Sequence, residues 1–225
     1  MIRRNNMKKL IAFLSLCIIF FSLPTSAGEA DSLFILINAE HPLPEDYVEI
    51  HQDDFVEIAF TRNDGRPIQK MRREAAHALD EMLSAAREAG FDITVTSAYR
   101  SREYQKQLFD AAVESYLARG MTKKEALRLT KRYYALPGES EHESGLAADI
   151  HHLSCATLAF ADTAEYRWLS ENAHKYGYIL RYPEGKESVT GIAFEPWHFR
   201  YVGREAAEEI YRTGLCLEEF LKEKS

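Results

Sequence analysis

Ser140-Glu-His-Glu-Ser-Gly-Leu-Ala-Ala-Asp149 is the segment around which the rest of the chain is interpreted, and Glu195-Pro-Trp-His198 follows it about fifty residues later. Together the two segments supply two imidazoles, those of His142 and His198, and the carboxylate of Asp149. Such a set can hold a metal ion such as zinc, which in catalytic sites keeps three protein ligands and an open fourth position. Glu195 adds a carboxylate that could accept a proton from water. The residues alone therefore indicate a candidate metal site with a neighbouring base.

The first segment favours a loop that leads into a strand. His142 and Asp149 are seven residues apart, which would place them on one face of a helix. The Pro137-Gly138 turn just upstream instead favours a loop, followed by a strand over residues 146–150. Gly145 can adopt the backbone conformations that let the chain fold back and bring His142 beside Asp149.

The second segment requires a break in the backbone before its histidine. Glu195 and His198 are three residues apart, so on a regular strand their side chains would face opposite ways. Pro196 cannot donate to a strand ladder and suits the start of a strand. We therefore expect Glu195 in a turn, with the strand beginning near Trp197, so that both side chains reach one metal ion.

Residues 1–27 have the layout of a secretory signal peptide. They carry four basic residues and no acid, an apolar run from Leu10 to Leu23, and small residues suited to cleavage after Ala27. The run of about fourteen residues is short for a membrane span of roughly twenty, although an uncleaved anchor is the alternative. We expect a secreted or extracytoplasmic protein that meets the membrane only through this segment, if it is not removed.

The charge of the remaining chain excludes one class of partner. Removing residues 1–27 takes away four of the 28 basic residues and none of the 35 acids, which leaves a net charge of −11. A nucleic-acid binder needs a basic face, so we expect no nucleic-acid partner. The length suits one domain, which we divide into an N-terminal arm at residues 28–48, stiffened by prolines, and a main domain at 49–225. We expect a monomer.

Two cysteines, Cys155 and Cys216, lie outside the signal segment. Outside the cell they could form one disulfide. Two unpaired buried thiols are the alternative, because the sequence does not give the distance between them. Neither cysteine has the spacing of a cysteine zinc site.

Hydrophobic periodicity predicts an α+β fold. Helical patterns cover residues 72–89, 103–119, 123–134, 162–175 and 204–211, and Thr122 is the expected N-cap of the third. Short strand patterns cover residues 93–96, 146–150, 178–182 and 198–202. The helices and strands interleave irregularly, so we expect a small antiparallel sheet that carries the metal site, with helices packed against it.

The spacing also resembles a known family. Ser140-x-His142-x-x-Gly145-x-Ala147-x-Asp149 followed by Glu195-x-x-His198 is similar to the signature of the D-alanyl-D-alanine metallopeptidases. These are the VanY- and VanX-like enzymes, related in fold to lysostaphin-type peptidases and the hedgehog signalling domain. Further blocks resemble the VanY branch, and the similarity spans roughly residues 33–211. These blocks are residues 97–101 with Gln105, residues 38–44, residues 177–183 and residues 195–203.

The resemblance implies a role for each site residue. His142, Asp149 and His198 would be the zinc ligands. Glu195 would be the general base that takes the proton from the zinc-bound water and later protonates the leaving amine. Arg100 would stabilise the oxyanion, a role that suits its permanent charge and planar donors.

Four further residues are expected to bind substrate. By the resemblance, Ser140 would help to hold the terminal carboxylate of the substrate. Gln105 and Tyr99 are candidates for hydrogen bonds in the pocket, and Trp197 could form a wall of it. At position 143, where the VanY branch would have a polar amide, this chain has Glu143. We expect this extra acid either to lie behind the metal ligands or to be solvated; it replaces no ligand and bears on substrate preference.

The resemblance implies a zinc-dependent D,D-carboxypeptidase that removes the terminal D-alanine from peptidoglycan stem peptides. L,D-carboxypeptidase or endopeptidase activity on the same scaffold is the alternative within the class. A non-catalytic, hedgehog-like zinc-containing binding module is the alternative from another class. Binding alone requires neither Glu195 nor Arg100, so their presence favours catalysis.

Overall fold

A four-stranded antiparallel sheet lies at the centre of the structure, a computed structural model that describes residues 33–225. The signal-peptide prediction and the first residues of the N-terminal arm lie outside these residues. Within residues 33–225, no helix has the length and apolar character needed to cross a membrane.

The strand order of the main sheet is β3-β4-β6-β5, and every neighbouring pair is antiparallel. The predicted α+β class and antiparallel sheet are therefore confirmed. A separate two-stranded sheet pairs β1 with β2 and was not predicted. The strands are β1 (Phe55–Glu57), β2 (Lys70–Arg72), β3 (Thr94–Ser97), β4 (Ala147–His151), β5 (Tyr178–Leu180) and β6 (His198–Tyr201).

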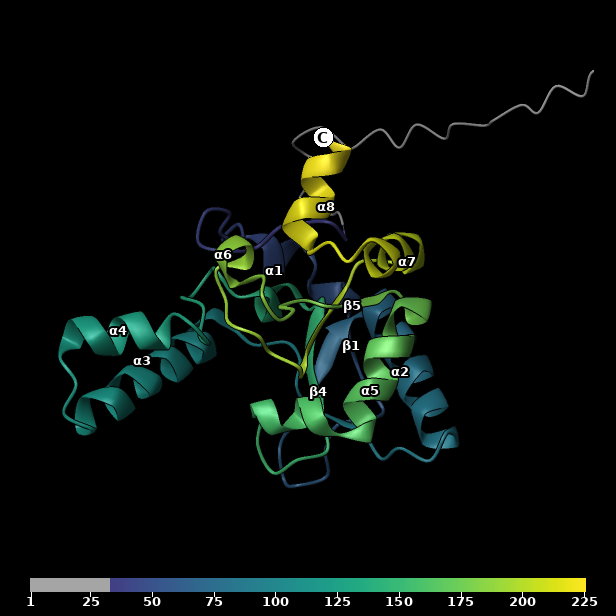
Figure 1. Ribbon diagram of the computed structural model, residues 1–225, viewed down its shortest axis with the longest axis horizontal. Coiled ribbons are helices and arrows are strands. Elements are labelled where there is room, and N and C mark those ends of the chain that lie inside the picture. Colours follow the sequence, from purple (N-terminus) through teal and green to yellow (C-terminus); the bar gives the residue numbers. More distant parts are fainter. Residues whose placement is uncertain (1–32) are drawn as a thin grey trace, which may run out of the picture.

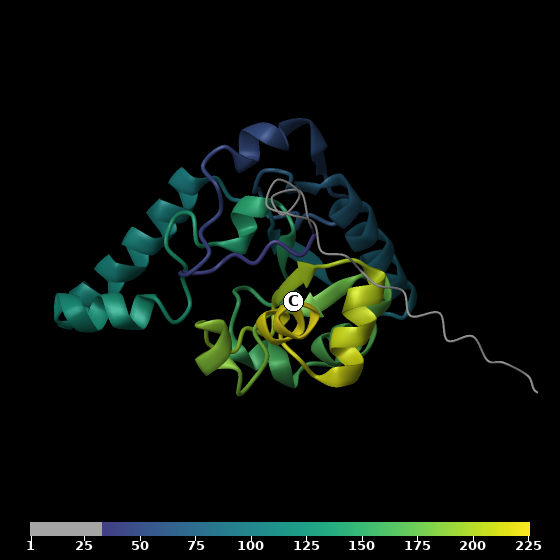
Figure 2. The ribbon, with the colours of Figure 1, turned by 90° about the horizontal axis from the view of Figure 1, so that it is seen from above.

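Helices surround the sheet unevenly. In Figure 1, α2 and α5 lie on one side of the strands, whereas α3 and α4 form a hairpin that projects on the other side. Viewed from above, the hairpin again stands away from the body (Figure 2). The helices are α1 (Tyr47–Ile50), α2 (Arg73–Glu88), α3 (Arg102–Ala118), α4 (Lys123–Thr130), α5 (Ala164–Asn172), α6 (Glu187–Thr190), α7 (Arg204–Thr213) and α8 (Leu217–Lys224).

Short 3-10 turns connect several of these elements. They are η1 (Gln52–Asp54), η2 (Glu141–Ser144), η3 (Leu158–Asp162) and η4 (Ala173–Tyr176). The turn η2 leads directly into β4, so the segment upstream of Asp149 is a loop and a strand, as its prolines and glycines predict. Helix α5 is followed by η4, and together they cover the single helix predicted at residues 162–175.

The largest apolar core lies between α2 and the sheet. Leu79, Met82 and Leu83 on α2 are almost completely buried together with Val95 and Ile150 of the sheet. Each such side chain contributes about 1.5–3 kcal/mol when it leaves water. This burial fixes α2 against β3 and β4, and so gives the metal-site strands a rigid support.

Some predicted elements are longer than the observed ones. Helix α4 begins after Thr122, whose side chain caps it as predicted and forms a reciprocal pair with Glu125. It ends at Thr130 rather than at residue 134, and the carbonyl of Arg132 accepts a hydrogen bond from Ala193. The strand predicted to residue 182 ends at Leu180, after which Arg181 enters a buried ion-pair cluster.

The two cysteines do not form a disulfide. Cys155 is exposed and Cys216 is buried, and both are free thiols. Of the two alternatives left open by the sequence, the unpaired state is the observed one, although only Cys216 is buried.

Candidate metal centre

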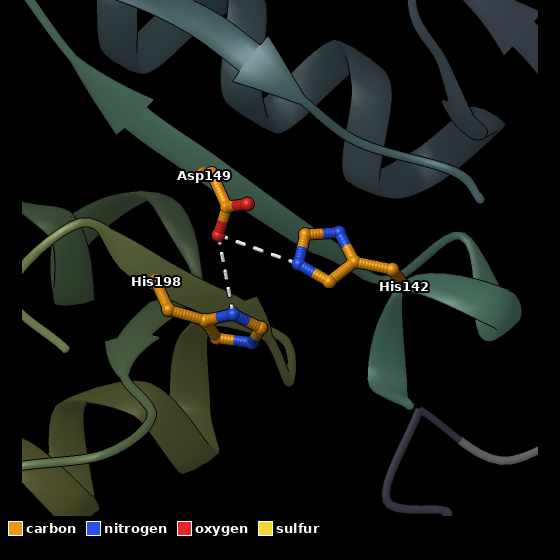
Figure 3. A group of neighbouring side chains, drawn as sticks. All are labelled: His142, Asp149 and His198. Atoms are coloured by element: carbon orange, nitrogen blue, oxygen red, sulfur yellow. Dashed lines mark ion pairs between the residues drawn. The ribbon is translucent and has the colours of Figure 1, made fainter. Parts of the chain in front are cut away.

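Three side chains converge at the sheet, as Figure 3 shows. His142 comes from the turn η2, Asp149 from β4 and His198 from β6. Asp149 Oδ1 lies 3.3 Å from His142 Nε2 and 3.3 Å from His198 Nδ1. One ligand atom from each residue lies within 4.8 Å of the others, and all three residues are buried. The structure therefore brings together the three residues predicted as metal ligands.

The strand register sets this geometry. Asp149 pairs directly with His198 across β4 and β6. His142 returns to Asp149 because Gly145 adopts a left-handed conformation with φ of 71° at the end of η2. A Cβ atom at that glycine would collide with the ring of Phe55. The predicted fold-back at Gly145 is thus confirmed, and it depends on the absence of a side chain there.

The donor atoms fit a metal ion. His142 Nδ1 lies 2.7 Å from the carbonyl oxygen of Ala98, so the proton of the ring belongs on Nδ1 and Nε2 is free to coordinate. His142 Nε2 and Asp149 Oδ1 are buried and have no hydrogen-bond partner. Two ligands of a tetrahedral zinc ion, with bonds of about 2.0–2.1 Å, lie roughly 3.3 Å apart. The observed separations match that spacing.

Burial and neighbouring charges shift the pKa values of the three candidate ligands when no metal is bound. Burial, together with the charge of Arg100, lowers the pKa of His142 to about 4. Burial opposes the charged form of His198, but its contacts with Asp149 and Glu141 raise its pKa to about 9. Burial also disfavours an ionised Asp149, yet His142 and Arg100 hold its pKa well below the usual value. Asp149 therefore supplies a negative charge at the centre of the cluster.

Glu195 lies at the edge of this cluster. Its Oε2 is 3.7 Å from His198 Nδ1, and its carbonyl oxygen accepts a hydrogen bond from the backbone of His198. Strand β6 begins at His198, directly after the Pro196 turn, as the sequence predicts to within one residue. Burial, with a smaller effect of Asp149, raises the pKa of Glu195 to about 8. The side chain is thus close to the three candidate ligands, and in the absence of a metal ion its burial favours the protonated form.

Arg100 is held by three side chains and points at the cluster. It forms an ion pair with Asp149 through Nη2, donates from Nε to Ser97 Oγ at 2.7 Å, and donates from Nη1 to Gln105 at 3.4 Å. The amide of Gln105 in turn donates to the carbonyl oxygen of Ala135. Gln105 therefore orients Arg100 in addition to lining the cavity.

An open cavity of about 510 Å³ ends at the cluster. Ser140, Gln105 and Trp197 line it, together with Arg100 and Glu195. Tyr99 is not among its lining residues, and its ring packs edge-on against Phe55 with centroids 4.7 Å apart. The outer part is lined by aromatic side chains of α3 and of the segment after α4, namely Tyr104, Tyr116, Tyr133 and Tyr134.

Glu143, which follows His142, stabilises the surrounding loop. Glu143 is buried and accepts hydrogen bonds from the backbone of Gly138 at 2.7 Å and from Arg102 Nε at 3.1 Å. It does not line the cavity. The prediction that this acid is solvated or lies behind the metal ligands was wrong, because its carboxylate binds the backbone of Gly138 and the side chain of Arg102.

Sequence reasoning missed a buried ion-pair cluster behind His198. Glu141, Arg181 and Arg200 are almost completely buried and contact one another. One signal was available: Arg200 is a charged residue between two aromatic residues, Phe199 and Tyr201, in the short strand β6. Its partner at position 141 lies on a distant segment and cannot be inferred from spacing.

A buried His–Asp–His cluster at the end of an open cleft, with a free carboxylate and an arginine beside it, is the site of a metal-dependent hydrolase. A family model for the D-alanyl-D-alanine carboxypeptidases, VanY, matches residues 68–204. The chain belongs to this VanY family. It is a metallocarboxypeptidase by that membership.

Individual relatives agree with the family. The chain is 38% identical over 194 residues to a D-alanyl-D-alanine carboxypeptidase of Enterococcus faecalis, covering 86% of this chain and 67% of the relative. Among solved structures, the LD-carboxypeptidase LdcB matches with a TM-score of 0.72 and 38% identity, over 84% of this chain and 86% of LdcB. A vancomycin-resistance D,D-pentapeptidase VanY in complex with Zn(II) matches with a TM-score of 0.69 and 37% identity, over 84% and 98%.

Proposed function

We propose that the protein is a zinc-dependent D,D-carboxypeptidase that removes the terminal D-alanine from peptidoglycan stem peptides outside the cytoplasmic membrane. The observation that carries the proposal is the position of Asp149 Oδ1, 3.3 Å from both His142 Nε2 and His198 Nδ1 at the end of the cleft, with Glu195 beside them. Family membership and the zinc complex of a related D,D-pentapeptidase support the metal and the substrate class. The signal-peptide pattern of residues 1–27 supports the compartment.

Three residues would hold the zinc ion: His142 through Nε2, Asp149 through Oδ1 and His198 through Nδ1. A zinc ion bound there supplies a Lewis acid that polarises the scissile carbonyl group and makes an attacking water more acidic. Asp149 shares its second oxygen with Arg100, so its carboxylate also orients the arginine. Two imidazoles and one carboxylate leave the bound ion with a net positive charge.

Glu195 acts as the general base in this proposal. Its carboxylate accepts the proton of the attacking water and then gives it to the leaving amino group of D-alanine. Without metal, burial raises the pKa of Glu195 to about 8. A zinc ion held by the neighbouring ligands would lower that pKa and favour the carboxylate form that a base requires. The short turn at Pro196 keeps Glu195 beside His198 without using it as a ligand.

Arg100 stabilises the negative charge that develops on the carbonyl oxygen. Ser97 and Gln105 orient its guanidinium group before the substrate arrives, so little reorganisation is needed during the reaction. We assign Ser140 to the terminal carboxylate of the substrate and Trp197 to the wall of the pocket, since both line the cavity. Tyr99 would act on the substrate only indirectly, because its ring lies against Phe55.

L,D-carboxypeptidase activity is the second candidate. The observation that favours it is the similarity of this fold to LdcB, an LD-carboxypeptidase. The two activities differ in the chirality of the residue before the scissile bond, and the same metal, base and arginine would serve both. The cavity has the size of a site for a drug-sized ligand, which exceeds a terminal dipeptide and suits a longer stem peptide.

The test is cleavage of defined stem peptides. The purified zinc-loaded protein is incubated separately with a pentapeptide that ends in D-alanyl-D-alanine and with the corresponding tetrapeptide, and the products are identified by mass. Loss of one D-alanine from the pentapeptide is the expected result. Preferential cleavage of the tetrapeptide would assign the L,D activity. A zinc-loaded protein that cleaves neither peptide would contradict the proposal and favour a binding function.

A further inference from the structure

Glu141 lies behind His198, on the side of the imidazole ring away from Asp149. Its Oε2 is 3.6 Å from His198 Nε2, whereas Asp149 Oδ1 is 3.3 Å from Nδ1 of the same ring. The ring of His198 therefore lies between Glu141 at Nε2 and the carboxylates of Asp149 and Glu195 at Nδ1. Glu141 Oε2 and His198 Nε2 face each other at ion-pair distance, and both are buried without a hydrogen-bond partner. Only the Asp149 side faces the converging donor atoms.

The other oxygen of Glu141 is already occupied. Its Oε1 accepts hydrogen bonds from Arg181 Nε at 2.6 Å and from Arg200 Nη1 at 2.7 Å. All three side chains are completely buried. The two guanidinium groups fix the carboxylate in position and leave Oε2 directed at His198. Glu141 is therefore oriented by its own neighbours before any metal binds.

The charge balance keeps Glu141 ionised. Its Oε1 forms buried ion pairs with two guanidinium groups, those of Arg181 and Arg200, which favour the carboxylate form. An ionised carboxylate can only accept, so the proton of the neutral imidazole belongs on Nε2, facing Glu141. Nδ1 then presents its lone pair toward the cluster. Arrangements of this kind, in which a carboxylate orients a ligand histidine, strengthen metal binding.

The ion pairs extend to the C-terminal helix. Arg181 donates from Nη1 and Nη2 to the two carboxylate oxygens of Glu218 on α8, at 2.9 and 2.7 Å. This bidentate pair is geometrically specific and strong. Helix α8 is thereby linked through Arg181 and Glu141 to His198.

We propose that Glu141 is a positioning residue that fixes the tautomer and orientation of His198 for zinc, and that Arg181 and Glu218 hold it from α8. The inference rests on the proposed zinc site. Glu141 does not line the cavity. Its proposed role is therefore to position His198, whereas Glu195 and Arg100 act on the substrate.

The first test compares two neighbouring buried acids. Glu141→Gln should weaken zinc binding by about 10- to 100-fold, the usual effect of losing a carboxylate behind a ligand histidine. Glu143→Gln, the matched control in the same turn, should change zinc affinity less than about threefold, because its carboxylate faces Gly138 and Arg102. The zinc dissociation constant is measured by competition with a chromophoric chelator. Equal affinities in the two variants would overturn the proposal.

A second measurement needs no substitution and so does not depend on the folding of Glu141→Gln, which takes away the negative charge paired with two buried arginines. In the zinc-loaded wild-type protein, long-range ¹H–¹⁵N correlation spectra should show His198 with its proton on Nε2 and zinc on Nδ1. A proton on Nδ1 would overturn the proposal even if no variant can be purified.

The ion pair between Arg181 and Glu218 is tested separately. Glu218→Gln should weaken zinc binding less than Glu141→Gln does, because Arg181 would keep its contact with Glu141. A larger effect than that of Glu141→Gln would contradict the proposed order of contacts. Zinc affinity and tautomer are measured without peptide, so they remain informative if the protein cleaves neither stem peptide. Failure of the wild-type protein to bind zinc would instead overturn the proposed function.

Discussion

Asp149 on β4 and His198 on β6 lie directly opposite each other in the antiparallel sheet, and their facing atoms Oδ1 and Nδ1 are 3.3 Å apart. The geometry of the metal centre is therefore a property of strand pairing. A slip of one residue in this register would turn one side chain to the other face of the sheet. The core beneath the strands, centred on α2, protects the site against such a slip.

Substitution of Glu195 should separate metal binding from catalysis. Glu195→Gln keeps the shape of the side chain but removes the proton acceptor, so kcat should fall by about 10²–10⁴-fold. Zinc content should stay at the wild-type value, because the three ligands are unchanged. Both are measured on the same preparation, by D-alanine release and elemental analysis. Loss of zinc, with activity restored by excess metal, would show that Glu195 is a ligand.

Substitution of Arg100 tests the role of its planar donors. Arg100→Lys retains a positive charge but loses the fork that contacts Asp149, Ser97 and Gln105. We expect kcat to decrease by about 10²–10³-fold, the range found when one donor to a developing oxyanion is removed. Steady-state kinetics on the stem pentapeptide measure the effect. An unchanged kcat with a raised KM would assign Arg100 to substrate binding alone.

Removal of zinc should destabilise the protein. Zinc binds only the folded arrangement of the three ligands, and a free concentration of 1,000 times the dissociation constant adds about 4.1 kcal/mol of stability. For a domain of this size, that corresponds to a melting temperature higher by roughly 8–16 °C. Thermal unfolding with and without a chelator gives the difference, and Mg²⁺ serves as the control ion. Equal melting temperatures would argue against binding at this buried site.

Gly145 should tolerate no side chain. Gly145→Ala places a Cβ at φ of 71°, which costs about 1–2 kcal/mol, and drives it into Phe55, which adds about 1–3 kcal/mol. Gly191→Ala is the control, since φ is 76° there but no atom lies within 4 Å of the new Cβ. Urea unfolding should therefore show the larger loss for Gly145→Ala. Equal losses would mean that the ring of Phe55 moves aside without cost.

Local patterns predicted most of the fold that carries the site. Helix α2 has its small and apolar residues at helical spacing, and the strand preceding Arg100 is rich in β-branched residues, so both could be located from sequence. Strands β1 and β2 have three residues each and carry no periodic signal. Helix α8 was missed although Leu217, Phe220 and Leu221 recur at helical spacing and pack together in an apolar cluster.

The site was predicted best where the motif is local and worst where neighbours point in opposite directions. Tyr99 and Arg100 are adjacent, yet their side chains diverge to Phe55 and to Asp149. Adjacency within a motif therefore does not show that two residues share a pocket. Glu143 and His142 are also adjacent, yet Glu143 contacts Gly138 and Arg102 whereas His142 faces Asp149. Contacts between distant segments decide these cases.

The distribution of the site along the chain bears on when it can form during synthesis. His142 and Asp149 precede His198 by about fifty residues in the chain. Strand β4 can pair with β6 only once residue 201 is available. The contact between Arg181 and Glu218 waits longer still, until α8 is made. Because domains fold as units once their segments are available, a nascent or truncated chain carries an incomplete centre. We therefore expect hydrolytic activity only after the chain through α8 has been made and, for an exported protein, has folded outside the membrane.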